Sequence, residues 1–200
     1  QALKNLNERN FYEMTRMRLR VGLPCVNVLG SMLNNELTGQ YDFLTLPQVV
    51  CQELGGHFNR VCKTLLHSTG FYSELGDKKS PKLITGKELP INFPEIVENY
   101  NEPIGHIRYQ GNNISVYFGM GDLQAAFLGS EIDDDSILIN IGTGSQIIKV
   151  FNNNLTFGTE MRPYLFEKNL ECITHIPAGK VFGVPLEHTA AFWEKMRDLT

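Results

Sequence analysis

The chain has 200 residues, of which 42% are hydrophobic and 20% charged, so it is long enough to bury one large or two small cores. Its formal net charge is −4, and its basic residues form no stripe of the kind that binds nucleic acid. No apolar run approaches the roughly 18 residues of a membrane helix, and no signal peptide stands at the start shown. We therefore expect a cytoplasmic protein without nucleic-acid or membrane partners.

The cysteines and histidines are not spaced for a zinc site. Cys25, Cys51, Cys62 and Cys172 include no CxxC pair, and three of them lie in apolar surroundings, which is typical of buried thiols in a reducing compartment. The five histidines form no cluster. We therefore assign no metal site from the protein side chains alone.

Apolar residues recur at helical spacing in the first third of the chain. They predict an amphipathic helix over residues 2–20, in which the basic run Arg16 to Arg20 forms one face. A second helix is predicted over residues 26–37 and, after a turn at 42–47, a third that carries the stripe from Phe58 to Leu66. We expect these helices to cover a sheet.

Asp122 lies between a predicted strand and a predicted helix. Residues 68–103 are interrupted by glycine and proline and predict irregular loop, whereas 114–118 predict a strand and 123–128 a short helix. Ligands of α/β proteins gather where strands end, so Asp122 is a candidate functional residue. For a lone aspartate before a helix the N-cap is the more common role, and the two roles are compatible.

A β-hairpin is predicted over residues 136–150. Ser136 to Ile141 and Gln146 to Val150 are rich in Ile and Val, and the four residues between them can adopt positive φ: Gly142, Thr143, Gly144 and Ser145. Such a turn can direct several backbone N–H groups at one phosphate, with close approach over the glycines. It is also an ordinary hairpin turn, and the residues alone leave both interpretations open.

The acidic run from Ser130 to Asp135 predicts a solvated connection between domains. Its neighbouring carboxylates diverge, so we assign it no divalent cation. Further strands are predicted over 155–164 and 170–176, and a helix over 185–199 that begins with a proline.

Two motifs in sequence order carry a resemblance to a known family. GMGDLQAA at 119–126, the acidic linker, and ILINIGTGSQ at 137–146 resemble the FGGY family of carbohydrate kinases. The runs HSTGFY, FPEIVE, EMRPY and THIPAG are also similar to that family. The resemblance implies an α/β, actin-like (ribonuclease H-like) ATPase fold in partial form. Residues 1–129 would be the carboxy-terminal half of the first, sugar-binding domain, and residues 136–200 the start of the second, ATP-binding domain.

The resemblance also implies a reaction and a set of site residues. The family transfers the γ-phosphoryl group of ATP, with Mg²⁺, to a sugar hydroxyl; the GDLQA form is most similar to kinases of ketoses such as sedoheptulose and xylulose. Asp122 would be the catalytic base and a sugar contact, with Gln124 as a second sugar contact. The ATP phosphates would face Gly142, Thr143, Gly144 and Ser145. A homodimer is a further expectation.

Two departures from the family pattern leave other functions open. Leu123 follows the aspartate where many family members have a sugar-binding Gln or Asn, and neither the DxGTT phosphate loop nor the adenosine-binding glycines are found. We therefore expect the isolated 200-residue chain to be inactive. The alternatives are a non-enzymatic actin-like sugar or nucleotide sensor, and an actin-like phosphotransferase of the acetate kinase or hexokinase type.

Overall fold

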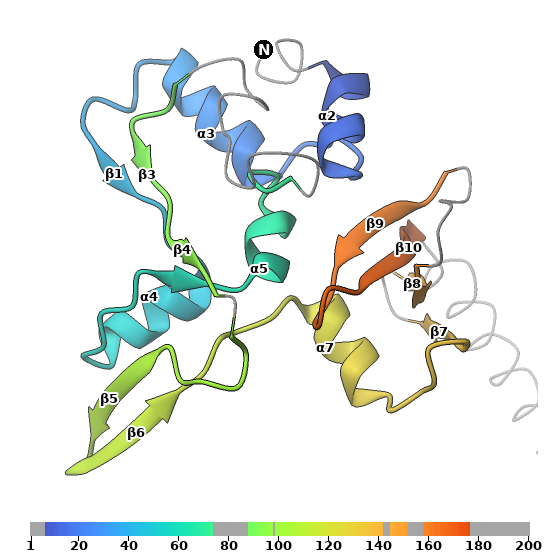
Figure 1. Cartoon of the computed structure of the whole chain (residues 1–200). Coiled ribbons are helices and arrows are strands. Elements are labelled where there is room, and N and C mark those ends of the chain that lie inside the picture. The colour runs from blue at the N-terminus through green and yellow to red at the C-terminus, as the bar shows by residue number, and fades with distance from the viewer. Residues whose placement is uncertain (1–6, 74–87, 98, 142–144, 152–157, 177–200) are drawn as a thin grey trace, which may run out of the picture.

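The computed structural model describes most of the chain (Figure 1). It contains two hydrophobic clusters. The described residues are 7–73, 88–97, 99–141, 145–151 and 158–176. None of their helices has the length and apolar character needed to cross a bilayer. The predicted helix at 185–199 lies outside these residues.

The amino-terminal part, residues 7–116, consists of short helices and two-stranded pairs. The helices are α2 (Glu8–Thr15), α3 (Pro24–Leu33), α4 (Leu46–Glu53) and α5 (Lys63–Ser68). The strands are β1 (Tyr41–Asp42), β2 (Arg60–Val61), β3 (Ile91–Asn92), β4 (Glu95–Ile96), β5 (Gly105–Tyr109) and β6 (Asn112–Val116). Their pairing is β1 with β3 and β2 with β4, both parallel, and β5 with β6, antiparallel.

The predicted helix over 2–20 is too long, because α2 ends at Thr15 with Arg16 as its C-cap. Arg16 is left-handed, with φ of 56°, and its N–H donates to the carbonyl of Tyr12. The next backbone groups bond to a distant strand: Met161 N–H donates to Arg16 O at 3.0 Å, and Arg18 N–H donates to the Glu160 carboxylate at 2.8 Å. The prediction that the basic run forms a helix face is therefore wrong.

The stripe from Phe58 to Leu66 is only partly helical. Arg60–Val61 pairs with Glu95–Ile96 as a parallel strand, and helix α5 begins after it at Lys63. Helix α4 begins within the predicted turn at 42–47, where Thr45 N–H donates to Gln48 Oε1 at 2.8 Å in a capping box.

The sheet that we expected beneath the helices of the amino-terminal part is absent from its described residues, which form only two-stranded pairs. The strand predicted at 114–118 is shifted to β6, and it forms a hairpin with β5 that projects from the body of the molecule (Figure 1). The segment 88–97 contains β3 and β4, although irregular loop was predicted there.

The carboxy-terminal sheet confirms the predicted hairpin and the strands after it. It contains β7 (Ile137–Asn140), β8 (Ser145–Val150), β9 (Glu160–Pro163) and β10 (Asn169–Ile176), in the order β7-β8-β10-β9 with antiparallel neighbours. Helix α7 (Asp122–Gly129) packs Leu123 and Phe127 against this sheet.

Each hydrophobic cluster draws on a different part of the chain. The first cluster consists of Phe11, Met17, Leu23, Cys25, Val26, Leu29, Val61, Leu66, Phe71 and Tyr72. The second cluster consists of Leu123, Phe127, Ile148, Val150, Tyr164, Leu165, Leu170 and Cys172. At about 25 cal/mol per Å² of buried apolar surface, these clusters supply the main drive for folding.

His67 on α5 is a buried titratable group beside the first cluster. Its Nε2 lies 2.7 Å from the carbonyl of Thr15 and donates to it, while Nδ1 has no hydrogen-bond partner among the described residues. Burial, with a smaller contribution from Arg162, lowers the pKa of His67 to about 3. The imidazole is therefore neutral in the folded chain at pH 7.

We expect His67 to make the folded chain sensitive to mild acid. Its pKa is lowered on folding, so its contribution is present above about pH 6.5 and is lost as the pH falls. Between pH 7 and pH 5 the unfolding free energy should fall by about 2 kcal/mol more in wild type than in His67→Gln, which can donate to Thr15 but does not titrate. Urea unfolding at both pH values measures this difference. An equal change in unfolding free energy between pH 7 and pH 5 for the two proteins would refute the prediction.

Candidate functional site

Asp122 is the first residue of α7 and is exposed. The predicted start of a helix here is confirmed, but the N-cap is Gly121, which has no side-chain cap bond. Among the described residues, the Asp122 carboxylate has one hydrogen bond, in which Oδ1 accepts the N–H of Leu123 at 2.8 Å. The helix dipole favours a negative charge at this end. The carboxylate thus lies at a helix start and is accessible.

The residue before Asp122 is fixed from two sides. Gly121 N–H donates to Thr64 Oγ1 on α5 at 3.1 Å, and a Cβ on Gly121 would lie 2.4 Å from Oε1 of Gln124. Gln124 cannot easily move away, because it is 4% exposed and its Nε2 donates to the carbonyl of Pro163 at 2.9 Å. The start of α7 therefore contacts both α5 and β9.

Gln124 is buried in this arrangement. Its amide nitrogen is bonded to β9 and its oxygen lies against Gly121. Its predicted contact with a sugar stays a prediction, and the structure adds a packing role that the sequence did not indicate.

The predicted phosphate loop lies at the β7–β8 turn. Gly142, Thr143 and Gly144 are outside the described residues. Ser145 is described: it is 3% exposed and pairs with Ile176 of β10, after a shift in the β8–β10 register. The strands on either side pair up to Asn140 and Gln146, so the base of the turn is anchored in the sheet.

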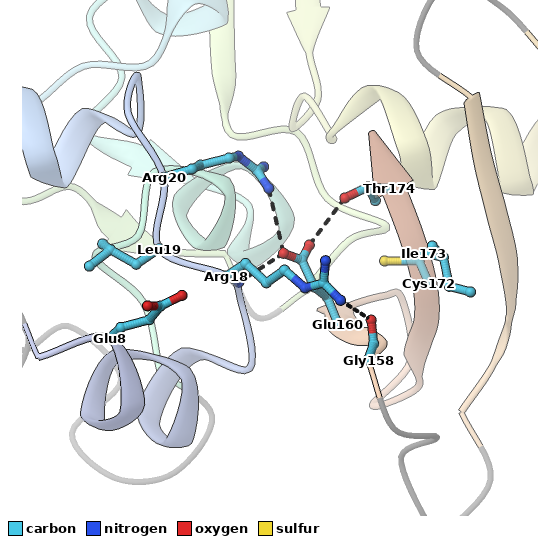
Figure 2. A pocket seen from close by; sticks show the side chains of 9 residues that line it. All are labelled: Glu8, Arg18, Leu19, Arg20, Gly158, Glu160, Cys172, Ile173 and Thr174. Carbon is cyan, nitrogen blue, oxygen red and sulfur yellow. Dashed lines mark hydrogen bonds and ion pairs between the residues drawn. The ribbon is translucent and has the colours of Figure 1, made fainter. Parts of the chain in front are cut away.

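A pocket of about 280 Å³, lined by both charged and apolar residues, lies between the segment after α2 and the β9–β10 edge (Figure 2). Glu160 lies at its centre, with a 2% exposed fraction. One carboxylate oxygen accepts from Arg18 N–H at 2.8 Å and lies 3.5 Å from Arg20 Nη1; the other accepts from Arg162 at 2.5 Å and from Thr174 at 3.3 Å. Both oxygens of the Glu160 carboxylate are therefore already hydrogen-bonded within the protein.

Cys172 also lines this pocket, and burial raises the pKa of its thiol to about 11. Cys25 is likewise buried, and desolvation raises the pKa of its thiol to about 12. Both are therefore protonated at neutral pH and are poor nucleophiles. Within the described residues, no group of three His, Cys, Asp or Glu could hold a metal ion.

Comparison of the structure with solved structures gives strong matches. The glycerol kinase of Plasmodium falciparum, solved with ADP, matches with a TM-score of 0.71 and 14% identity over 93% of this chain and 41% of its own. The xylulose kinase of Rhodospirillum rubrum matches with a TM-score of 0.69 and 12% identity, over 88% of this chain and 38% of its own. The gluconate kinase of Lactobacillus acidophilus matches with a TM-score of 0.66 and 16% identity, over 88% of this chain and 38% of its own. The chain has the fold of the FGGY-type carbohydrate kinases.

The match covers most of this chain but about two fifths of each kinase. No family model matches the sequence, and no curated protein matches it. At these identities the likeness concerns the carbohydrate kinase fold. The resemblance seen in the two sequence motifs is thus confirmed at the level of architecture.

Two site features were missed by sequence reasoning. Thr64 and Pro163 contact the start of α7 from positions 57 and 39 residues away from their partners, and no local pattern indicates such contacts. Glu160 carried one usable signal, since it is an acid inside the apolar-flanked strand segment EMRPY.

We expect Glu160→Gln to destabilise the chain by about 3 kcal/mol or more, because it leaves the buried guanidinium of Arg162 without its charged partner. Asp134→Asn is the matched control: it removes the carboxylate of an ion pair with Lys168 whose side chains are 55% and 44% exposed. That change should cost less than about 1 kcal/mol. Denaturant unfolding of both variants measures the difference, and equal losses would contradict a structural role for the Glu160 cluster.

Proposed function

We propose that the full-length protein is an ATP-dependent kinase that phosphorylates a hydroxyl of a sugar, namely a ketose such as sedoheptulose or xylulose. One observation carries the proposal: an accessible aspartate stands at the start of α7, at the position where the GD motif falls in a chain with the carbohydrate kinase fold. The alternative of a sugar or nucleotide sensor has no specific observation in its favour.

In the proposed mechanism Asp122 accepts the proton of the attacking sugar hydroxyl. Its carboxylate is exposed, and its one described hydrogen bond leaves acceptor capacity on both oxygens. Phosphoryl transfer requires mainly that hydroxyl and phosphate be aligned, with little covalent chemistry from the protein. A carboxylate fixed at a helix start fits this requirement.

ATP and Mg²⁺ are the proposed cofactors. The residue types of the predicted loop, Gly142, Thr143, Gly144 and Ser145, fit phosphate. The two glycines and Thr143 offer backbone N–H groups and a hydroxyl, while Ser145 is buried as the first residue of β8. Mg²⁺ is commonly bound by one or two carboxylates together with substrate phosphates. The ion supplies charge neutralisation on the transferred group, while the turn and Asp122 orient the reactants.

The remaining assignments follow from the same proposal. Residues 1–129 would belong to the sugar-binding domain and residues 136–200 to the ATP-binding domain, with the acidic run between them. A contact of Gln124 with the sugar, a cytoplasmic location and a homodimer are further parts of it. Because Leu123 occupies the position next to Asp122, sugar contacts there would differ from those of many family members.

We expect Asp122→Asn in the full-length protein to lower kcat by roughly 10²–10⁴-fold, as for loss of a general base, with the sugar KM within a few-fold. The amide oxygen can still accept the Leu123 N–H, so stability should be nearly unchanged. A coupled ADP assay over a panel of ketoses measures the effect, with Asp135→Asn as an exposed-acid control.

Three results would count against the kinase. Binding of a sugar without ADP release would favour the sensor, and phosphorylation of acetate would favour another phosphotransferase. A near-normal kcat in Asp122→Asn with a lowered melting temperature would make Asp122 a helix-stabilising residue only.

Valine at Gly142 or Gly144 should raise the KM for ATP by tenfold or more, because a β-branched side chain blocks the close approach of a phosphate. Thr143→Ser keeps the hydroxyl and should stay within about threefold of wild type. Steady-state kinetics with varied Mg-ATP measure this. Unchanged ATP KM in both valine variants would remove the turn from the ATP site.

A further inference from the structure

The backbone N–H of Gly121 is held by a side chain from a distant segment. Thr64 on α5 is 1% exposed, and its Oγ1 accepts the Gly121 N–H at 3.1 Å. The same hydroxyl donates its proton to Sγ of Cys62 at 3.3 Å. Because the proton is directed at Cys62, a lone pair of the oxygen is directed at Gly121.

The other side of Gly121 is fixed as well. Its carbonyl accepts the N–H of Ala125 at 2.9 Å in the first turn of α7. Its Cα lies against Oε1 of Gln124, whose own amide nitrogen is bonded to Pro163 of β9. Gly121 is therefore held by α5 on one side and by α7 with β9 on the other.

We propose that Thr64 is a positioning residue for Asp122, an inference that rests on the proposed function. Within the described residues the Asp122 carboxylate bonds only to Leu123, its own neighbour, so its placement depends on the backbone that presents it. The nearest tertiary hydrogen bond on that backbone is the one from Gly121 to Thr64. A shift of about 1 Å in a reacting group can cost on the order of 100-fold in rate.

Thr64→Val separates positioning from packing. Valine has nearly the volume of threonine, so the buried contacts of the side chain are kept while the acceptor for Gly121 N–H is lost. In the full-length protein we expect kcat to fall by roughly 10- to 100-fold, with KM for sugar and ATP within threefold. Thr64→Ser, which keeps the hydroxyl, should retain kcat within threefold.

Thr69→Val is the matched control. Thr69 is the C-cap residue of α5 and is also buried; its hydroxyl donates to Leu66 O and accepts from Phe71 N–H, without contact to Gly121. Its loss should lower the melting temperature to a similar extent as Thr64→Val and leave kcat unchanged. If Thr64→Val does not fold, Thr64→Ala removes the same hydroxyl without a branched replacement and carries the same expectation.

Measuring Asp122→Asn in the same assay keeps the two proposals distinguishable. If Asp122→Asn lowers kcat but Thr64→Val keeps it, or if Thr69→Val loses as much kcat as Thr64→Val, the positioning role is wrong and the kinase stands. If Asp122→Asn itself retains normal kcat, the proposed function is wrong, and the positioning role that rests on it is wrong as well. A kcat loss in Thr64→Val that serine rescues and Thr69→Val does not share supports the positioning role.

Discussion

The carboxylate of Glu160 joins the two parts of the described chain. Burying an ionised carboxylate costs several kcal/mol unless its oxygens are paired and hydrogen-bonded. Here the donors come from both sides: the backbone of Arg18 and the guanidinium of Arg20 from the segment after α2, and Arg162 and Thr174 from β9 and β10. The segment after α2 consequently bonds to β9 instead of continuing the helix.

Helix α7 lies where the two parts meet. Its apolar residues Leu123 and Phe127 belong to the cluster of the carboxy-terminal sheet, while the backbone just before it is bonded to α5 of the amino-terminal part. A carboxylate at this start is presented to the boundary between the parts without being buried in either.

The sequence predicted local structure well where a residue pattern repeats, and poorly where a contact with a distant segment determines the local conformation. The hairpin of β7 and β8 follows from alternating Ile and Val around a glycine turn, and it was confirmed. Helix α2 is shorter than predicted because Arg16 adopts a left-handed conformation so that its carbonyl can bond to Met161. The pairing of Arg60–Val61 with residues 35 positions later likewise overrides a helical stripe.

The candidate site likewise has parts that the sequence predicted and parts that it did not. The aspartate and its helix start were predictable from GDLQAA, and its catalytic role stays a prediction. The contacts of Gly121 with Thr64 and of Gln124 with Pro163 depend on the tertiary fold, and a single sequence contains no signal for them. Helix α4 was missed although Thr45 and Gln48 form a capping box, because Leu46, Val49 and Val50 are exposed and give no core-facing stripe.

Two of the three buried thiols can serve as internal reporters. Cys25 belongs to the first hydrophobic cluster and Cys172 to the second, and burial keeps both protonated. Because the thiolate is the species that reacts with alkylating reagents, each cysteine becomes reactive only when its own cluster opens. The rate of labelling at each, read by mass spectrometry of the peptides, would therefore tell whether the two clusters open together or independently.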